Sequence, residues 1–267
     1  MLIRFTAVAA ERPKIALIID DMGAQQALGL AALQLPGAVT YSFLPFAPYT
    51  QQLASLAYQQ NKELMLHMPM QAIEPEKWEA GELKLSMTQA ELADLVQRQL
   101  QEIPYIAGVN NHKGSLVTQD YASMRDIMQL LVAARGHSLY FVDSLTTSQS
   151  IAQQVALEFG LASRARDVFL DHNAPDTAIV RQQFRQLIIL ARRYGSALGI
   201  AHPRPNTLKV LRDELPNMAA LGVQLVPVSA LCFQYPQGRV FNRQEVAAKI
   251  KARFQAETEI IGEYDIF

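Results

Sequence analysis

The sequence contains a single cysteine, Cys232, among its 267 residues. One cysteine cannot form an intramolecular disulfide bond, and it cannot supply the paired thiols of a CxxC metal or redox motif. The sequence therefore excludes a disulfide-stapled scaffold and a site built on paired thiols. We expect Cys232 to be a small buried residue that contributes to packing.

Charged residues and long apolar segments are also scarce. Charged residues make up 18% of the chain, the net charge is −1, and no Lys/Arg-rich run occurs. A nucleic-acid partner is therefore not expected, because such partners need a basic surface. No uncharged apolar run reaches the roughly 18 residues that a membrane-spanning helix requires. Half of the residues are hydrophobic, which is typical of a globular chain that buries a large core.

The first residues resemble part of an export signal. Residues 1–10 read MLIRFTAVAA, and Ala7-Val8-Ala9 is typical of a cleavage site made of small residues. The apolar run is short and Arg4 interrupts it, so residues 1–13 are interpreted as a leader or as the remnant of an export signal. We accordingly expect a periplasmic or otherwise exported protein, with a cytoplasmic location as the alternative.

Short apolar or β-branched runs recur along the chain, and helical patterns separate them. Several runs are apolar without alternation, as in strands that are covered on both faces. Helix signals include the capping box of Thr88 and Glu91, and the terminating Gly136, Gly160 and Gly195. We expect strands at residues 15–19, 38–43, 63–66, 106–109, 139–142, 168–170, 197–201 and 223–228.

Strands and helices that alternate in this way predict parallel βαβ units. Eight such units favour a (β/α) barrel formed by one domain over residues 14–235. A doubly wound open sheet is the alternative, but no GxGxxG or Walker A pattern follows the first strand. Residues 71–85 are expected to form a long loop across one mouth of the barrel. Residues 236–267, with a helical stretch at 243–254, are interpreted as a C-terminal appendage.

Carboxylates, imidazoles and amides gather at the carboxyl ends of the expected strands. In parallel α/β folds, the loops at these ends open on the same side and form the active site. A single His or Asp at such a place is often structural, but the convergence of many predicts a functional site. These residues are Asp20, Asp21, His67, Asn110, Asn111, His112, Lys113, Asp143, Ser144, Asp171, His172, His202 and Arg204.

The residue types at these ends suit a mononuclear metal centre. Imidazole and carboxylate ligands that leave one position open are typical of zinc, or of a similar divalent ion, that activates water. Of Asp20 and Asp21, one would ligate the ion, and the other would act as a base or orient a ligand. His202 is the candidate general acid.

Other polar residues at the same ends are expected to bind substrate. Asn110 and Asn111 would supply amide donors. Arg164, Arg166 and Arg204 would hold a substrate carboxylate or pair with an aspartate. The expected substrate-binding set is Asn110, Asn111, Asp143, Asp171 and Arg204.

Six separated motifs between residue 14 and about residue 232 form a recognisable set. They are IIDDMG (18–23), LHMPMQ (66–71), GVNNHKGS (108–115), FVDSLT (141–146), RDVFLD (166–171) and AHPRPNT (201–207). This set resembles the divergent polysaccharide deacetylases, bacterial and mostly exported relatives of the NodB-type enzymes of carbohydrate esterase family 4. The resemblance implies a single-domain, NodB-like, distorted (β/α)7-type barrel and a metal-dependent deacetylase ancestry.

The resemblance also implies roles for individual residues. It makes Asp20 the catalytic base and Asp21 and His67 metal ligands. It makes His202, in the sequence GIAH (199–202), the catalytic acid.

The sequence departs from the family pattern at two places. The usual H-x-x-x-H metal pair is incomplete, because Gln71 stands at its second position. We therefore expect His112, on the next strand end, to supply the third ligand; the alternative is that His112 only hydrogen-bonds substrate. The usual Arg-x-Pro-Tyr motif is replaced by NNHKG (110–114).

Three functional hypotheses follow from these patterns. One is an exported, metal-dependent hydrolase, with zinc as the first choice of metal, that acts on an acylated cell-envelope glycan or a related amide or ester. Another is a non-catalytic descendant that uses the same rim to bind a glycan or a cell-envelope partner. The third is an unrelated barrel enzyme that uses His and Asp for acid–base chemistry without a metal.

Overall fold

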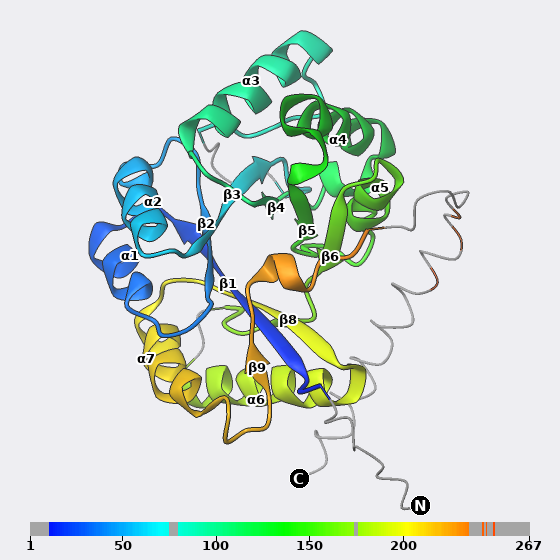
Figure 1. Cartoon of the computed structure of the whole chain (residues 1–267). Coiled ribbons are helices and arrows are strands. Elements are labelled where there is room, and N and C mark those ends of the chain that lie inside the picture. Colours follow the sequence, from blue (N-terminus) through cyan, green and yellow to red (C-terminus); the bar gives the residue numbers. More distant parts are fainter. Residues whose placement is uncertain are drawn as a thin grey trace, which may run out of the picture.

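The computed structural model describes residues 11–74, 80–173 and 176–234, together with residues 242, 244 and 248. It shows one parallel sheet ringed by helices (Figure 1). The strands are β1 (Lys14–Met22), β2 (Thr40–Phe43), β3 (Glu63–Met70), β4 (Gly108–Lys113), β5 (Tyr140–Asp143), β6 (Ala162–Ala165), β7 (Val168–Phe169), β8 (Ser196–Ala201) and β9 (Gln224–Leu225). The helices are α1 (Gln26–Leu33), α2 (Thr50–Gln59), α3 (Gln89–Glu102), α4 (Tyr121–Arg135), α5 (Ala152–Glu158), α6 (Thr177–Tyr194) and α7 (Pro205–Glu214).

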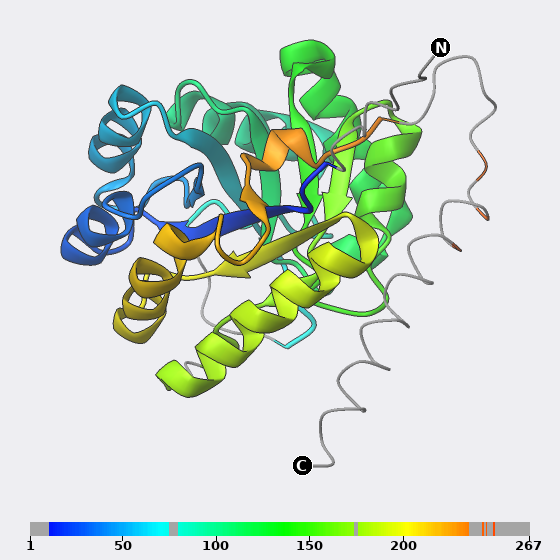
Figure 2. The same ribbon diagram turned by 60° about the horizontal axis from the view of Figure 1, so that its bottom comes forward.

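The sheet curls into a distorted barrel. Its strand order is β6-β5-β4-β3-β2-β1-β8-β7, and β9 pairs with the first residues of β1. Every ladder is parallel, and the helices lie on the outside of the curl (Figure 2). Within the described residues no ladder joins β6 to β7, so the barrel stays open there. The expected single-domain, NodB-like (β/α)7-type barrel is confirmed.

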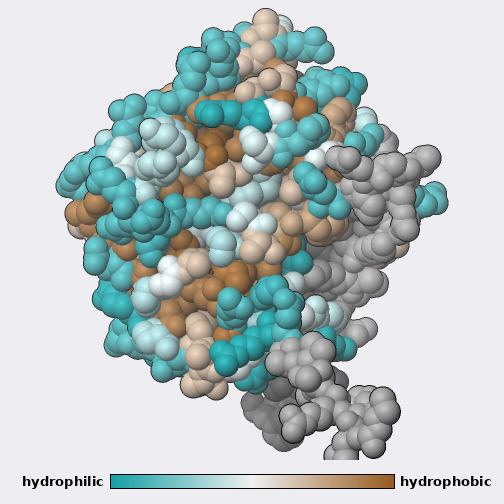
Figure 3. All heavy atoms as spheres, viewed as in Figure 1, coloured by the Kyte–Doolittle hydropathy of each residue, from teal (hydrophilic) through white to brown (hydrophobic). Residues whose placement is uncertain are grey.

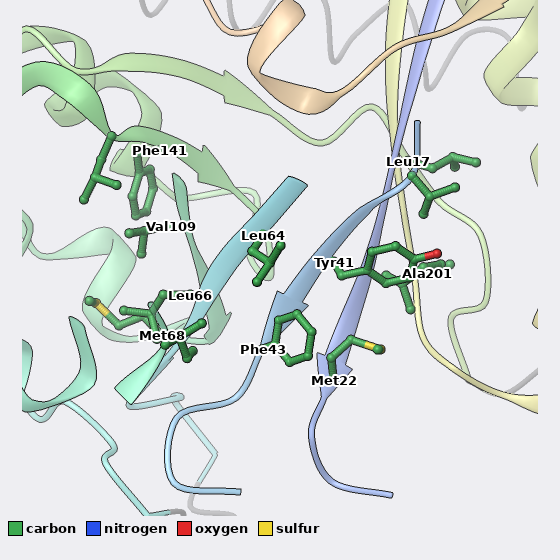
Figure 4. Close-up of a cluster of buried hydrophobic side chains, with 14 of the residues drawn as sticks. Leu17, Met22, Tyr41, Phe43, Leu64, Leu66, Met68, Val109, Phe141 and Ala201 are labelled. Atoms are coloured by element: carbon green, nitrogen blue, oxygen red, sulfur yellow. The ribbon is translucent and has the colours of Figure 1, made fainter. Parts of the chain in front are cut away.

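The strands bury side chains on both faces, which explains their continuous apolar runs. One set of alternating residues fills the inside of the barrel, including Ala16 and Ile18 on β1, Met65 on β3, and Leu198 and Ile200 on β8. The opposite set packs under the helices. Figure 4 shows part of that outer layer, in which Leu17, Tyr41, Leu64, Val109 and Phe141 come from five neighbouring strands.

The helices present hydrophilic residues to solvent. On the face that carries β9, hydrophilic residues cover much of the outer ring, and hydrophobic residues are visible between them (Figure 3). Within the described part of the chain, no helix is both long enough and apolar enough to span a bilayer.

Local sequence signals fix several helix ends. The Thr88 side chain accepts a hydrogen bond from the Glu91 backbone N–H, and the Glu91 carboxylate accepts one from the Thr88 N–H, which confirms the expected capping box. Gly136 and Gly195, both with positive φ, follow the last residues of α4 and α6, as expected.

The structure differs from the expected strands in three respects. β6 was not expected, because ASRA carries no β-branched or aromatic residue; its ladder with β5 forms it. The strand expected at 223–228 is limited to β9, and a 3₁₀ turn at Val228–Ala230 follows. β1, β3 and β4 end three or four residues later than expected, because continuous ladders such as Met65–Met70 with Gly108–Lys113 extend them.

Some expectations fall wholly or partly outside the described residues. Residues 1–10 of the leader lie there, as does nearly all of the tail at 236–267 with its expected helix at 243–254. The loop at 71–85 is described only at its two ends. There Leu83 bridges Met70 and donates its backbone N–H to the Pro69 carbonyl, so this end of the loop lies against β3.

Candidate metal centre

The alternation of the strands brings the predicted site residues to one mouth of the barrel. Successive side chains of a strand point to opposite faces, so residues two apart share a face. Asp20 follows the inward-facing Ile18, His67 follows Met65, and His202 follows Ile200. Asn110 and His112 occupy corresponding positions on β4, opposite His67 and Pro69 of β3.

Asp21 reaches the same site because β1 is irregular at its end. The register between β1 and β2 shifts between Ile19 and Met22, as in a β-bulge. Asp21 has a φ of 55°, a left-handed conformation that is uncommon for a residue other than glycine. The local turn therefore lets two adjacent aspartates contribute to one site, and the cost of this conformation is typical of functional positions.

Three potential metal ligands meet at this mouth. The distance is 3.0 Å from His67 Nε2 to His112 Nδ1, 3.3 Å from His67 Nε2 to Asp21 Oδ1, and 3.2 Å from His112 Nδ1 to Asp21 Oδ1. A tetrahedral zinc ion with bonds of about 2.0–2.1 Å separates neighbouring ligand atoms by roughly 3.3 Å. The three atoms therefore form one triangular face of such a site, and Asp21, His67 and His112 together are the ligand triangle.

The environment of Asp21 also fits a cation. Its Oδ1 atom is buried and has no hydrogen-bond partner among the described residues, which is costly for a carboxylate without a compensating charge. Burial acts to raise the pKa of Asp21, but the contacts with His112 and His67 outweigh it and hold the pKa well below its usual range. Asp21 is therefore ionised at neutral pH.

Asn110 connects the second aspartate to the ligands. It is fully buried; its Nδ2 donates to Asp20 Oδ1 at 2.9 Å, and its Oδ1 lies 2.9 Å from His67 Nδ1. A His67 that donates its Nδ1–H to this oxygen leaves Nε2 unprotonated and directed at the ligand triangle. Burial raises the pKa of Asp20, although the neighbouring His67 and His202 act to lower it.

His202 completes the site from β8. Its Nδ1 lies 2.9 Å from Asp171 Oδ1, and its Nε2 lies 3.6 Å from Asp21 Oδ2. Burial acts to lower the pKa of His202, but the hydrogen bond that its ring donates to Asp171 and the neighbouring carboxylates raise the pKa above the usual value. Asp171 is itself held by Thr207, whose hydroxyl donates to Oδ2 at 2.7 Å.

A cavity of about 540 Å³ opens beside these residues. Asp20, His67, His112 and His202 line it on one side. Apolar residues of β7, β8 and α6 and several cationic and amide groups line the rest. Its size and mixed lining are typical of a site for a small molecule or for one unit of a polymer.

The predicted substrate-binding residues are mostly behind the cavity wall. Asn111 lines the cavity and accepts a hydrogen bond from the Ser144 N–H. Asn110 and Asp171 are fully buried and contact Asp20, His67 and His202, which favours a positioning role, and their assignment to substrate contact stays a prediction. Their burial, not their position on the strands, removes them from the surface.

Asp143 and Arg204 also make hydrogen bonds within the protein, and their assignment to substrate contact stays a prediction as well. The buried carboxylate of Asp143 accepts hydrogen bonds from the Leu145 and Gln153 N–H groups and from the Ser150 hydroxyl, so it organises the segment after β5. Arg204 donates a short hydrogen bond to the Asp171 carbonyl and does not line the cavity.

Other cavity residues were missed as site candidates. Phe169 of β7 lies between His172 and His202, with ring-centroid distances of 5.3 and 5.4 Å. Gln183 and Gln186 reach the cavity from α6. Phe169 lies in the RDVFLD motif, which could have indicated that it belongs to the site. Gln183 and Gln186 could not be identified from the sequence, because the position of α6 over the cavity depends on tertiary packing.

Comparison with known proteins agrees with this geometry. A model of the divergent polysaccharide deacetylase family matches residues 17–232. An uncharacterized protein from Haemophilus influenzae is 35% identical over 227 residues, which cover 85% of this chain and 79% of that protein.

Solved structures share the fold. The uncharacterized protein ATU2773 from Agrobacterium tumefaciens superposes with a TM-score of 0.78 at 22% identity, over 83% of this chain and 90% of that chain. The catalytic domain of a peptidoglycan N-acetylglucosamine deacetylase from Eubacterium rectale gives a TM-score of 0.51 at 12% identity, over 87% and 96% of the two chains.

Proposed function

The chain belongs to the divergent polysaccharide deacetylase family, and from this membership we propose that it is a metal-dependent hydrolase that removes acyl groups from a cell-envelope glycan or a related amide or ester. The observation that carries the proposal is the ligand triangle of Asp21, His67 and His112, which faces the cavity beside two further titratable groups. The leader-like residues 1–13 support an exported, periplasmic place of action.

The three ligands suit zinc or a similar divalent ion. Two imidazoles and a carboxylate are ligands typical of catalytic zinc, and three protein ligands leave a position open. Such an ion, when bound, supplies Lewis-acid polarisation of a carbonyl and lowers the pKa of water. His112 takes the part that the second histidine of an H-x-x-x-H pair would have, while the Gln71 side chain accepts a hydrogen bond from the Leu85 N–H.

Asp20 is the proposed general base. It lines the cavity next to the ligand triangle, and Asn110 fixes one of its oxygens. Because burial raises the pKa of Asp20, this carboxylate accepts a proton from an attacking water more readily than an exposed aspartate does.

His202 is the proposed general acid. Asp171 accepts the hydrogen bond from Nδ1, which leaves Nε2 directed at the cavity. The raised pKa favours the protonated imidazole, which can donate a proton to the leaving nitrogen or oxygen of the substrate.

The test is acyl release by the zinc-loaded protein and its variants. Wild type should release acetate from an acetylated cell-wall glycan. Asp20→Asn and His202→Ala should each lower turnover by about a hundredfold or more, because general acid–base catalysis contributes about 10²–10⁴. Both variants should keep their zinc, because neither residue belongs to the ligand triangle.

His137→Ala is the matched control, since this exposed histidine precedes β5, whereas the site residues lie at the other ends of the strands. Unchanged turnover in Asp20→Asn or His202→Ala would remove that residue from the mechanism, and loss of zinc in Asp20→Asn would make Asp20 a ligand. A wild-type protein that binds the glycan but releases no acetate would instead support the non-catalytic alternative.

A further inference from the structure

The cavity beside the candidate metal centre has a cationic side. Lys113 ends β4, Arg166 follows β6, and His172 follows β7; all three line the cavity. These side chains come from the carboxyl ends of three different strands of the sheet. None of them belongs to the ligand triangle or to the proposed acid–base pair.

The acidic groups of the cavity are already neutralised. Asp167 receives a hydrogen bond from Arg164 at 2.9 Å and one from the Leu198 N–H at 2.7 Å. The charges of Asp20 and Asp21 would be offset by a divalent ion in the ligand triangle. Among the described residues that line the cavity, Lys113 and Arg166 are the groups that carry a permanent positive charge.

Arg166 is held in place before any ligand arrives. Its Nε donates to the Ser144 carbonyl at 2.8 Å, its Nη2 donates to the Leu145 carbonyl at 2.9 Å, and its guanidinium lies 4.9 Å from the centre of the Phe169 ring. A cation fixed in this way loses little conformational freedom when it binds an anion.

Lys113 is held through its backbone. Its carbonyl accepts hydrogen bonds from Asn111 Nδ2 and Thr146 Oγ1, both at 2.8 Å, and its φ of 53° is left-handed. Two hydrogen bonds thus fix the point from which the lysine side chain, which lines the cavity, extends.

The remaining lining adds a donor and an apolar wall. The buried Nε2 atom of Gln186 lines the cavity side of α6 and has no hydrogen-bond partner among the described residues, so it offers a donor to a ligand. Val168, Phe169, Leu190 and Ile200 supply apolar contacts, which suit the carbon face of a sugar ring.

We propose that the substrate is an anionic acylated glycan, whose carboxylate or phosphate group binds Lys113 and Arg166. Guanidinium and ammonium groups bind both kinds of oxyanion, and charge-assisted hydrogen bonds are stronger than neutral ones. This inference rests on the proposed function, because it takes the acyl group to lie at the ligand triangle while the anion lies on the cationic side.

The experiment measures equilibrium binding of two matched pairs of probes to the full-length, zinc-loaded protein. One pair is an oligosaccharide of alternating N-acetylglucosamine and glucuronic acid and its methyl ester. The other pair is N-acetylglucosamine 6-phosphate and N-acetylglucosamine. Wild type should bind the anionic member of at least one pair about tenfold or more tightly than the neutral member, as expected for hydrogen bonds to a charged group. The pair that shows the preference identifies the anion as carboxylate or phosphate.

Variants connect the preference to the two cations. Lys113→Gln should reduce the preference severalfold, Lys113→Arg should keep it, and the double variant Lys113→Gln/Arg166→Gln should lose it. Affinity for the neutral probes and zinc content should stay the same, which shows that the double variant is folded. Arg98→Gln, at an exposed site on α3, is the charge-matched control.

Equal affinity of wild type for both members of both pairs would overturn the proposal. A preference that persists in the double variant would also overturn it, because the anion would then bind elsewhere, for example at the ion. Binding is measured without turnover, so a preference for anionic probes without acetate release would contradict the proposed function but not this inference. Acetate release without a preference for anionic probes would support the proposed function and contradict this inference.

Discussion

His202 depends on Asp171 for both its orientation and its charge. The carboxylate accepts hydrogen bonds from Nδ1 and from the backbone N–H of His202, each at 2.9 Å, and is itself fully buried. A buried carboxylate next to an imidazole stabilises the protonated ring. In the proposed mechanism, Asp171 would therefore act through His202.

Replacement of Asp171 by Asn should change the pH dependence of hydrolysis. His202 is active when protonated, so activity falls as the pH rises through its pKa. The folded-state pKa is raised, and removal of the carboxylate should lower it, so the fall on the basic side should move to lower pH in Asp171→Asn. A pH profile of kcat/KM measures the shift.

Thr207→Val is the control, because it removes one hydrogen bond from the same carboxylate without removing its charge. Its profile should keep the wild-type midpoint. A basic limb that has the same midpoint in Asp171→Asn and wild type would mean that His202 is not the titrating acid.

Among the strands and helices, those with strong local signals were predictable and those formed by tertiary pairing were not. The apolar runs of β1, β3 and β8 and the caps of α3 and α6 agree with their expected places. β6 has weak strand propensity and exists because Ser163 and Arg164 pair with β5. The gathering of the site residues at one mouth of the barrel was predictable, because parallel strands end on one side. The contacts of Asn110 with Asp20 and His67 were not, because they depend on how β4 packs beside β3.

The capping box of α3 gives a test of local stability. Thr88→Ala removes the side-chain acceptor for the Glu91 N–H, and we expect a loss of about 1 kcal/mol in the free energy of unfolding. Urea unfolding measures the loss. Because Glu91→Gln keeps the amide oxygen that accepts from Thr88, it should cost less than Thr88→Ala. A loss within error of zero for Thr88→Ala would show that packing alone fixes the start of α3.

Side-chain contacts connect the strands across the gap between β6 and β7, where the barrel is open. The buried pair of Arg164 on β6 and Asp167 before β7 has an N–O distance of 2.9 Å, and Asp167 also accepts the Leu198 N–H of β8. Removal of one member of a buried pair leaves an uncompensated charge. This pair therefore stabilises the seam where no strand ladder is present among the described residues.

We expect Arg164→Met to lower the free energy of unfolding by about 3–5 kcal/mol. The double variant Arg164→Met/Asp167→Asn should lose less than Arg164→Met alone, since no unpaired charge remains and Asn keeps an acceptor for Leu198. Equilibrium denaturation of the four proteins forms a double-mutant cycle. The exposed pair of Arg98 and Asp94, also 2.9 Å apart, is the matched control, and Arg98→Met should cost less than about 1 kcal/mol. Strictly additive losses at Arg164 and Asp167 would contradict a coupled pair.

The proposed function depends most on one claim, that Asp21, His67 and His112 hold a single divalent ion at the mouth of the barrel. Zinc content and calorimetric zinc affinity of metal-stripped and reloaded protein test it directly. Wild type and His137→Ala should bind one zinc ion per chain with equal affinity, while His67→Ala and His112→Ala should each bind far more weakly, because each loses one of three protein ligands. Wild-type stoichiometry and affinity in both His67→Ala and His112→Ala would contradict the claim.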